Sequence, residues 1–85
     1  MIDATILAEV TAIVRRAGKV QPGIAVTADS RLVEDLAIDS LDLVDVVLKI
    51  QDKFDIAIDD EDVPNLRTVA DLAKHVSDRL GTAAV

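Results

Sequence analysis

The stretch EDLAIDSLDLVDVVLKIQDKF (residues 34–54) decides the fold of this 85-residue chain, because apolar residues recur in its second half with the period of an α-helix. Asp39 is a strong candidate for the N-cap of that helix, and Asp42, three residues later, can complete a capping pair. This register predicts a helix that begins at Asp39 or Ser40 and ends near Phe54.

Two further segments have a helical period. In residues 2–17 apolar side chains recur every three or four positions, Asp3 or Thr5 can begin the helix, and Gly18 can end it. In residues 68–80 the apolar stripe follows the letters TVAD, which read as a capping box because an acid stands three residues after a threonine. The chain is therefore expected to form three main helices.

The segments between these helices are expected to be loops that contain one short helix. Apolar residues of the long connection, residues 19–38, are expected to tie it to the core. These predicted anchors are Val26, Leu32, Val33, Leu36 and Ile38. In the second connection, residues 55–66, we predict an extended entry and a short helical turn near residues 59–63 that ends at Pro64.

Together these elements predict an all-α fold in one domain, residues 1–85. The architecture is a small four-helix bundle, with three main helices plus one short helix and a long first loop. Apolar residues make up 51% of the chain, which is enough for a folded domain. Phe54 is the only aromatic residue, so the core must be aliphatic.

Composition also restricts the function. The chain has no cysteine, which excludes disulfides, thiolate metal sites and cysteine nucleophiles and fits a cytoplasmic location. Its net charge of −7 repels nucleic acid and anionic membranes and favours basic partner surfaces, although solubility alone also explains it. No apolar run approaches the ~20 residues of a membrane span, and the N-terminus is a poor signal peptide. We expect no nucleic-acid partner and no membrane span.

The role of Ser40 is the main functional question. On the predicted register its hydroxyl is exposed at the positive end of the second helix, a position that suits a phosphate. Ser40 could be a helix cap, a nucleophile or an attachment point. A nucleophilic serine needs a neighbouring base, and the only histidine, His75, lies in the third helix, where we expect a surface or boundary position. Local sequence favours a cap over attachment but leaves both open.

The second helix has an unusually wide apolar arc beside a narrow charged one. The charged arc consists of Asp42, Asp45, Lys49, Asp52 and Lys53. One core contact does not require so wide an apolar arc. Either the helix packs against two other helices at once, or it borders both an apolar cavity and a partner surface.

The letters DLAIDSLD, residues 35–42, resemble the attachment motif of acyl carrier proteins, Asp-Ser-Leu preceded by Asp-Leu-Gly-Xaa. Residues 2–80 are also similar to that family in size, helix order, long first loop and acidity. The resemblance implies that Ser40 bears a covalent 4′-phosphopantetheine, whose thiol holds acyl groups as thioesters. It implies a cofactor-bearing carrier that is a substrate of other enzymes, and not an enzyme itself.

The same resemblance implies partners and site residues. A phosphopantetheinyl transferase moves the arm from coenzyme A with Mg²⁺, which Asp39 helps to bind in the transfer complex, so no stable metal site is expected. Leu41, Val44 and Leu48 are expected to line an acyl pocket. Enzymes of fatty-acid or specialised lipid synthesis are expected to place basic patches on the second helix of a free-standing, monomeric (type II) carrier. The predicted partner contacts are Asp42, Leu43, Asp45, Val46 and Asp52.

The sequence departs from the family pattern in two places. Ala37 stands where the family often has glycine, so we expect that the loop cannot adopt a positive φ there cheaply. Lys49 and Lys53 interrupt a face that is more uniformly acidic in a standard fatty-acid carrier, and we expect them to pair with Asp45 and Asp52. A specialised pathway fits at least as well. The alternatives are a carrier of aminoacyl, peptidyl or polyketide groups, or an unmodified helical docking protein.

Overall fold

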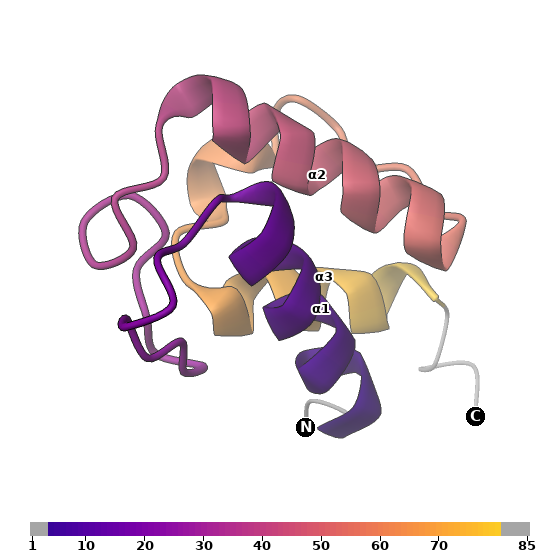
Figure 1. Cartoon of the computed structure of the whole chain (residues 1–85). Coiled ribbons are helices and arrows are strands. Elements are labelled where there is room, and N and C mark those ends of the chain that lie inside the picture. The colour runs from indigo at the N-terminus through magenta and orange to yellow at the C-terminus, as the bar shows by residue number, and fades with distance from the viewer. Residues whose placement is uncertain (1–3, 81–85) are drawn as a thin grey trace.

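The computed structural model describes residues 4–80, which form three α-helices and one 3₁₀ helix. Their bounds are Ala4–Ala17 for α1, Ser40–Phe54 for α2, Val63–Asn65 for the 3₁₀ helix η1 and Val69–Arg79 for α3. α1 packs against both α2 and α3, whereas α2 and α3 make few direct contacts with each other (Figure 1). The predicted all-α fold of three main helices and one short helix is confirmed. The predicted start of the first helix at Asp3 lies outside the described residues.

An aliphatic core lies where the three helices meet the long first loop. Its fully buried side chains are Val10, Val14, Leu32, Ile38, Val46, Ile50, Val69, Leu72 and Val76. Four of the five predicted loop anchors pack in or against this core, but Val33 is 58% exposed and that prediction was wrong. Its neighbours Leu32 and Leu36 take the two inward positions of the turn of residues 31–36, which leaves Val33 outside.

Hydrogen bonds to the start of α3 hold the long loop in place. The Leu32 N–H donates to the Arg67 carbonyl at 2.8 Å, and the N–H of Val69 donates to the Ser30 carbonyl at 3.1 Å. Ser30 itself is buried, and its hydroxyl accepts a hydrogen bond from the Thr27 N–H at 2.9 Å. These bonds satisfy buried backbone groups that would otherwise be costly to bury. The loop is therefore held against the start of α3, and this fixes the position at which α2 begins.

α1 ends where it was predicted to end, but two residues, Gly18 and Lys19, share the role of terminating it. Lys19 has a φ of 55°, and its N–H and that of Val20 donate back to Arg16 and Arg15, as in a Schellman motif. Gly18 is buried, and a Cβ there would lie 2.5 Å from the Val14 carbonyl oxygen. Glycine is therefore required at this position for close packing, whereas the lysine adopts the left-handed conformation.

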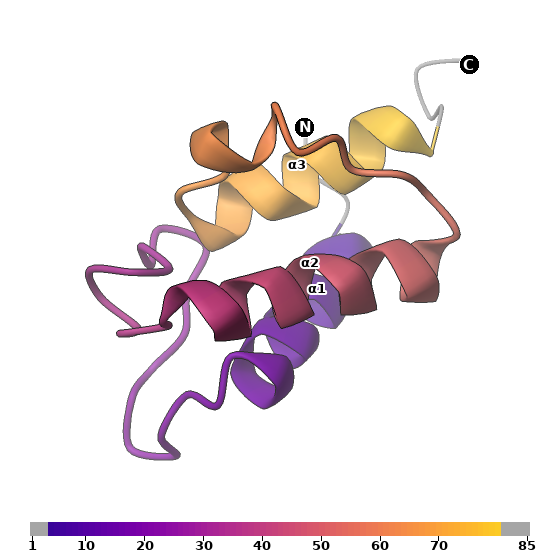
Figure 2. The same ribbon diagram turned by 90° about the horizontal axis from the view of Figure 1, so that it is seen from above.

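The segment between α2 and α3 begins at the end of α2 and runs back beside α3 to the residue where α3 starts (Figure 2). It leaves α2 through Asp55, which has a φ of 54°, and continues in extended form as predicted. Residues 59–62 form a turn, but the helical hydrogen-bonded unit is η1, later than the predicted residues 59–63. Pro64 lies inside η1 and does not end it, because the first turn of a helix needs no N–H from that residue.

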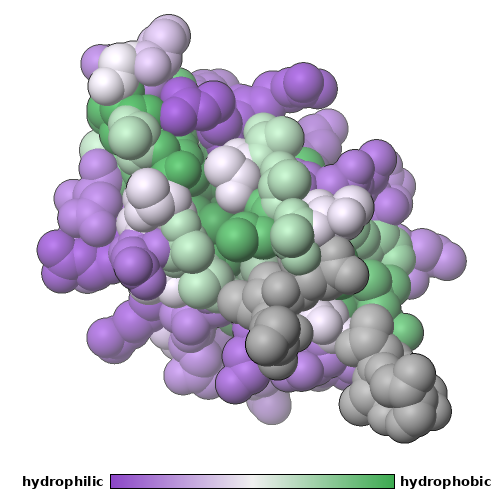
Figure 3. All heavy atoms as spheres, turned by 90° about the horizontal axis from the view of Figure 1, so that it is seen from below, coloured by the Kyte–Doolittle hydropathy of each residue, from purple (hydrophilic) through white to green (hydrophobic). Residues whose placement is uncertain are grey.

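Apolar side chains also reach the surface of this small domain. On the face seen from below, which is the side of the molecule away from α2, hydrophobic surface runs through the middle and hydrophilic surface surrounds it (Figure 3). Large exposed apolar residues are Val33, Leu41, Val44, Leu48 and Leu80. Three of the five belong to α2, so the exposed apolar residues concentrate on the helix that begins at Ser40.

Candidate functional site

The start of α2 has the predicted register. Asp39 is the N-cap in extended conformation, and its side chain accepts a hydrogen bond from the Asp42 N–H at 2.9 Å. Ser40 is the first helical residue and is exposed. The reciprocal half of the predicted capping pair is not formed, because the Asp42 carboxylate instead lies 3.5 Å from the Lys19 ammonium group. Since Asp39 caps the helix, the Ser40 hydroxyl is not needed for that purpose.

The Ser40 hydroxyl has no hydrogen-bond partner within residues 4–80. Its surroundings offer exposed space, the positive end of a 15-residue helix and no base. His75 lies in α3, where its side chain is 17% exposed at the predicted boundary position. The described residues contain no cluster of three or more His, Cys, Asp or Glu that could hold a metal ion. A free hydroxyl in this setting fits a phosphodiester attachment better than catalysis.

The backbone turn before Asp39 contains a left-handed alanine. Ala37 has a φ of 55°, so the loop adopts at this residue the positive φ that was expected to be costly there. For a residue with a Cβ this conformation costs about 1–2 kcal/mol. The turn is closed around it by the Leu36 N–H, which donates to Arg31 at 3.1 Å, and by the Ile38 N–H, which donates to Leu32 at 3.1 Å. Tertiary contacts of the buried Leu32 and Ile38 thus impose the conformation.

Arg31 organises this turn, a role that was not predicted from the sequence. Its guanidinium lies 2.8 Å from Glu34 and 3.2 Å from Asp35, and its backbone N–H donates to Asp35 at 2.8 Å. These hydrogen bonds, first that of the backbone N–H, lower the pKa of the Asp35 carboxyl, and the carboxylate raises the pKa of Arg31. The available signal was an arginine three and four residues before two acids. Asp35 of the motif therefore has a structural role in the turn.

An exposed apolar strip, formed by Leu41, Val44 and Leu48, runs along α2. Leu41 is 79% exposed, Val44 55% and Leu48 54%. The wide apolar arc of α2 is therefore only partly used for packing, and the first explanation, contact with two helices at once, does not account for it. The strip remains available for a ligand or a partner.

A small cleft of about 110 Å³ adjoins the apolar strip. Its lining residues are Val44, Val47, Leu48, Gln51, Ile58, Asp60 and Val63. Two of the three predicted pocket residues, Val44 and Leu48, thus stand at this cleft. Leu41 does not line it and projects into solvent, so its predicted place in the pocket does not match the structure.

The predicted partner contacts divide into buried and accessible residues. Val46 is fully buried, so the prediction that it touches a partner was wrong: the helical period turns it toward α1 and α3. Leu43 is half-buried against the core. Asp52 is exposed, and Asp45 and Asp42 are partly exposed. Of the five predicted contacts, the three acids and the outer part of Leu43 can meet a partner in this conformation.

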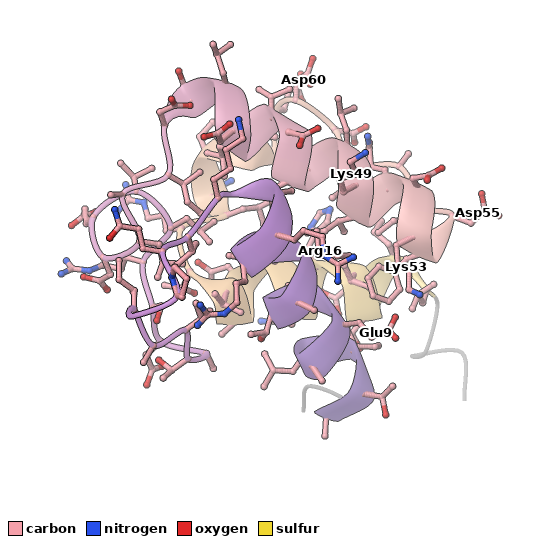
Figure 4. The ribbon with its side chains drawn as sticks, in the orientation of Figure 1. Glu9, Arg16, Lys49, Lys53, Asp55 and Asp60 are labelled. Carbon is pink, nitrogen blue, oxygen red and sulfur yellow. The ribbon has the colours of Figure 1, made fainter. Side chains whose placement is uncertain are left out.

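A mixed-charge groove of about 630 Å³ lies between the exposed sides of α1 and α2, which pack against each other. It is lined by Glu9, Ala12, Ile13, Arg16, Ala17, Asp45, Lys49, Asp52 and Lys53. Lys53 lies 3.4 Å from Glu9 across the groove, and Figure 4 shows the two side chains pointing toward one another. Neither lysine forms the expected ion pair with Asp45 or Asp52 in the described part of the chain. Lys53 therefore forms an ion pair between α2 and α1, whereas Lys49 is free to meet a partner.

Comparisons with known proteins agree with this geometry. A family model described as a phosphopantetheine attachment site matches residues 5–76. The acyl carrier protein of Rhodococcus erythropolis is 38% identical over 71 residues, which are 84% of this chain and 77% of that protein. The acyl carrier protein of Kineococcus radiotolerans is 43% identical over 60 residues, 71% of this chain and 74% of that protein.

A solved structure from Mycobacterium tuberculosis, provisionally named an acyl carrier protein, superposes with a TM-score of 0.75. It is 36% identical in sequence, and the match covers 86% of this chain and 96% of that one. Among the described residues no helix is long and apolar enough to cross a membrane. The fold, the attachment-site model and the named relatives thus agree with one another.

Proposed function

The chain belongs to the acyl carrier protein family, and from that premise we propose that residues 1–85 form one free-standing, monomeric carrier domain with the arm on Ser40. Proteins of this family are carriers with a covalent 4′-phosphopantetheine, whose thiol holds the acyl group as a thioester. The observation that supports Ser40 is its free, exposed hydroxyl at the first residue of α2, with the capping role already taken by Asp39.

Asp39 has two roles in this proposal. It keeps the first turn of α2 closed, which is worth about 1 kcal/mol for a typical N-cap. Its second carboxylate oxygen remains free to bind Mg²⁺ when a phosphopantetheinyl transferase docks, since Oδ1 accepts from Asp42. The metal belongs to the transfer complex. Losing Asp39 should therefore impair arm transfer more than it impairs folding.

The apolar strip and the acids beside it form the proposed docking surface. A partner enzyme with a basic rim and an apolar centre would cover Leu41 and Val44 while its cations approach Asp45 and Asp52. Such charges mainly speed encounter and select partners, and each exposed pair adds little by itself. The free Lys49 interrupts this acidic face. We therefore propose that the partners are dedicated enzymes of lipid synthesis in the cytoplasm. Their docking patches would fit a face that contains a cation, and not a uniformly acidic face.

Intact mass measures the proposed modification directly. The purified chain is incubated with coenzyme A, Mg²⁺ and a promiscuous phosphopantetheinyl transferase. The parent protein should gain the mass of one phosphopantetheine group, and Ser40→Ala should gain none. Ser77→Ala, a serine outside the motif, is the matched control and should be modified like the parent.

The opposite result is equally clear. If the folded parent gains no mass while the same transferase modifies a known carrier, the proposal is wrong and an unmodified docking protein is favoured. If Ser40→Ala still gains the full mass, the arm resides on another residue. Analysis of the protein from its source cell would then identify the acyl group and separate lipid cargo from aminoacyl, peptidyl or polyketide cargo.

A further inference from the structure

The segment of residues 58–63 forms one wall of the small cleft beside α2. Ile58, Asp60 and Val63 line the cleft opposite Val44 and Leu48. Because α2 and α3 make few direct contacts, this segment is what closes the space between them (Figure 2). The position of the wall therefore decides how wide the cleft is.

Side chains from both helices tether this wall. On the α2 side, the Gln51 side-chain oxygen accepts a hydrogen bond from the Ile58 N–H at 2.7 Å. On the α3 side, one nitrogen of the Arg79 guanidinium lies 3.2 Å from Asp59 and 3.4 Å from Asp62. We call this group of Arg79, Asp59 and Asp62 the clasp. Its two acids flank Asp60, so the clasp holds the wall on both sides of a lining residue.

His75, one helical turn before Arg79, supports the clasp. The Arg79 Nε donates to the His75 Nε2 at 3.5 Å, and the same Nε2 lies 4.0 Å from Asp62. The remaining contacts of the wall are apolar: Ile58 is buried, and Val63 packs against the core. The clasp is thus the main polar connection between α3 and the wall among residues 4–80.

The closed cleft is too small for a long acyl chain. Its volume of about 110 Å³ is well below the ~300–1,000 Å³ of pockets that enclose small-molecule ligands. To shelter more than a short chain the wall must move away from α2. The turn of residues 59–62, which lies between Asp55 and η1 and is mostly exposed, is the part of the wall that would have to move.

We propose that Arg79 is a positioning residue for the acyl chain: through Asp59 and Asp62 it holds the wall of the cleft against α2, and release of the clasp widens the cleft. This inference rests on the proposed carrier function. The clasp is exposed, with Arg79 42% and Asp59 66% exposed, so it is weak enough to open. A cation on a docked enzyme can compete with Arg79 for Asp59 and Asp62. Release of the clasp would then let the cleft admit a longer acyl chain.

The first experiment measures the wall in the unmodified protein, so it does not depend on attachment of the arm. Amide hydrogen exchange followed by mass spectrometry is compared for the parent, Arg79→Gln, Arg79→Lys and Lys74→Gln. Lys74 is the matched control, because it is an exposed cation of α3 without an ion pair in the described part of the chain. Arg79→Gln should raise exchange in residues 58–66 by about two- to five-fold, the effect expected when weak exposed ion pairs such as those with Asp59 and Asp62 are lost.

The variants separate the clasp from general stability. Arg79→Lys should restore part of the protection, and Lys74→Gln should change nothing. High salt should bring the parent close to Arg79→Gln, because exposed ion pairs are screened. If exchange in Arg79→Gln is unchanged, or if it rises equally in α1 and in the wall, the clasp does not hold the wall and the proposal is wrong.

The second experiment measures the acyl chain itself. The arm is loaded with an octanoyl group that has a terminal trifluoromethyl, and the fluorine NMR shift is compared in water and heavy water to measure solvent exposure. Arg79→Gln should reduce the solvent exposure of the fluorine relative to the parent and Lys74→Gln, because the wider cleft admits more of the chain than the closed cleft of about 110 Å³. If the wall loosens but the fluorine shift is the same in all variants, Arg79 has only a structural role and the inference is wrong. If no arm can be loaded, the proposed function fails, while the exchange result on the clasp still stands.

Discussion

At the scale of single residues, two backbone conformations decide how the site is presented. Ala37 occupies a left-handed conformation two residues before the helix cap, and Asp55 does the same where α2 ends. Neither is a glycine, so each has a conformational cost that contacts elsewhere in the fold must offset. At Ala37 those contacts are the buried side chains on either side of the turn, Leu36 and Ile38.

Ala37→Gly should therefore stabilise the protein. Glycine removes the Cβ clash of the left-handed conformation, and the gain exceeds the larger entropy that glycine has in the unfolded chain. We expect the free energy of unfolding to rise by about 0.5–1 kcal/mol, measured by urea denaturation. The matched control is Ala25→Gly, an exposed loop alanine without a positive φ, which should become less stable. A loss of stability in Ala37→Gly would contradict the strained turn.

At the scale of elements, the turn of residues 31–36 acts as the support for the start of α2. It contains one buried leucine at each end and an arginine held by two acids, Glu34 and Asp35. The Leu32 carbonyl accepts from the Ile38 N–H at 3.1 Å, which brings Asp39 to its capping position. The attachment helix thus begins where it does because of its own cap and because the turn before it is held in place.

The Arg31–Asp35 contact should make stability depend on pH. The pKa of Asp35 is lower in the folded protein than in the unfolded chain, so the contact stabilises the fold above the unfolded pKa and is lost as the pH falls through the folded pKa. Asp35→Asn should be less stable than the parent near neutral pH, and the difference should shrink below about pH 4. Urea midpoints measured across this range test it.

The control for this measurement is Asp29→Asn. Asp29 is an exposed acid of the same loop with no ion pair among residues 4–80. Its replacement should leave the midpoint close to that of the parent throughout the range. If Asp35→Asn behaves in the same way, the contact with Arg31 does not stabilise the turn.

At the scale of the whole molecule, α2 separates two surfaces. Its apolar strip and the cleft lie toward the segment of residues 58–63, whereas Asp45, Lys49 and Asp52 line the groove toward α1. The net charge of −7 acts at long range, whereas the apolar strip offers contact area. In the proposed docking, electrostatic attraction would bring a partner near and apolar contact would then hold it.

Asp45→Lys should slow arm transfer by the transferase at low salt. The substitution raises the net charge by two units beside the docking surface, so a basic enzyme is attracted less strongly. We expect the difference from the parent to be large at low salt and small at high salt, measured as the initial rate of mass gain. Asp78→Lys makes the same charge change on α3 and should slow the reaction less. Equal rates for the parent and Asp45→Lys at low salt would place Asp45 outside the interface.

Short-range pattern in the sequence determined the helices and the start of α2. The Asp39 cap and the apolar period act within a few residues, and so they can be read without knowing the rest of the fold. They were enough to place Ser40 as the first helical residue with an exposed hydroxyl and to identify the motif around it. They did not separate a capping Ser40 from a free one, which the structure does by showing Asp39 as the cap. The pattern also correctly predicted the capping box of Thr68 and Asp71 at α3.

Only the tertiary structure decided which apolar residues of α2 are covered. Val46 and Leu48 are equally apolar, yet the first is fully buried and the second is 54% exposed. The helical period says which residues share a face, but the positions of α1 and α3 say which face is covered. The same holds for Ala37, whose left-handed φ is imposed by distant packing, and for the Arg79 clasp, whose partners stand 17 and 20 residues away. Such long-range contacts leave no periodic signal in the chain, because each depends on how separate elements come together.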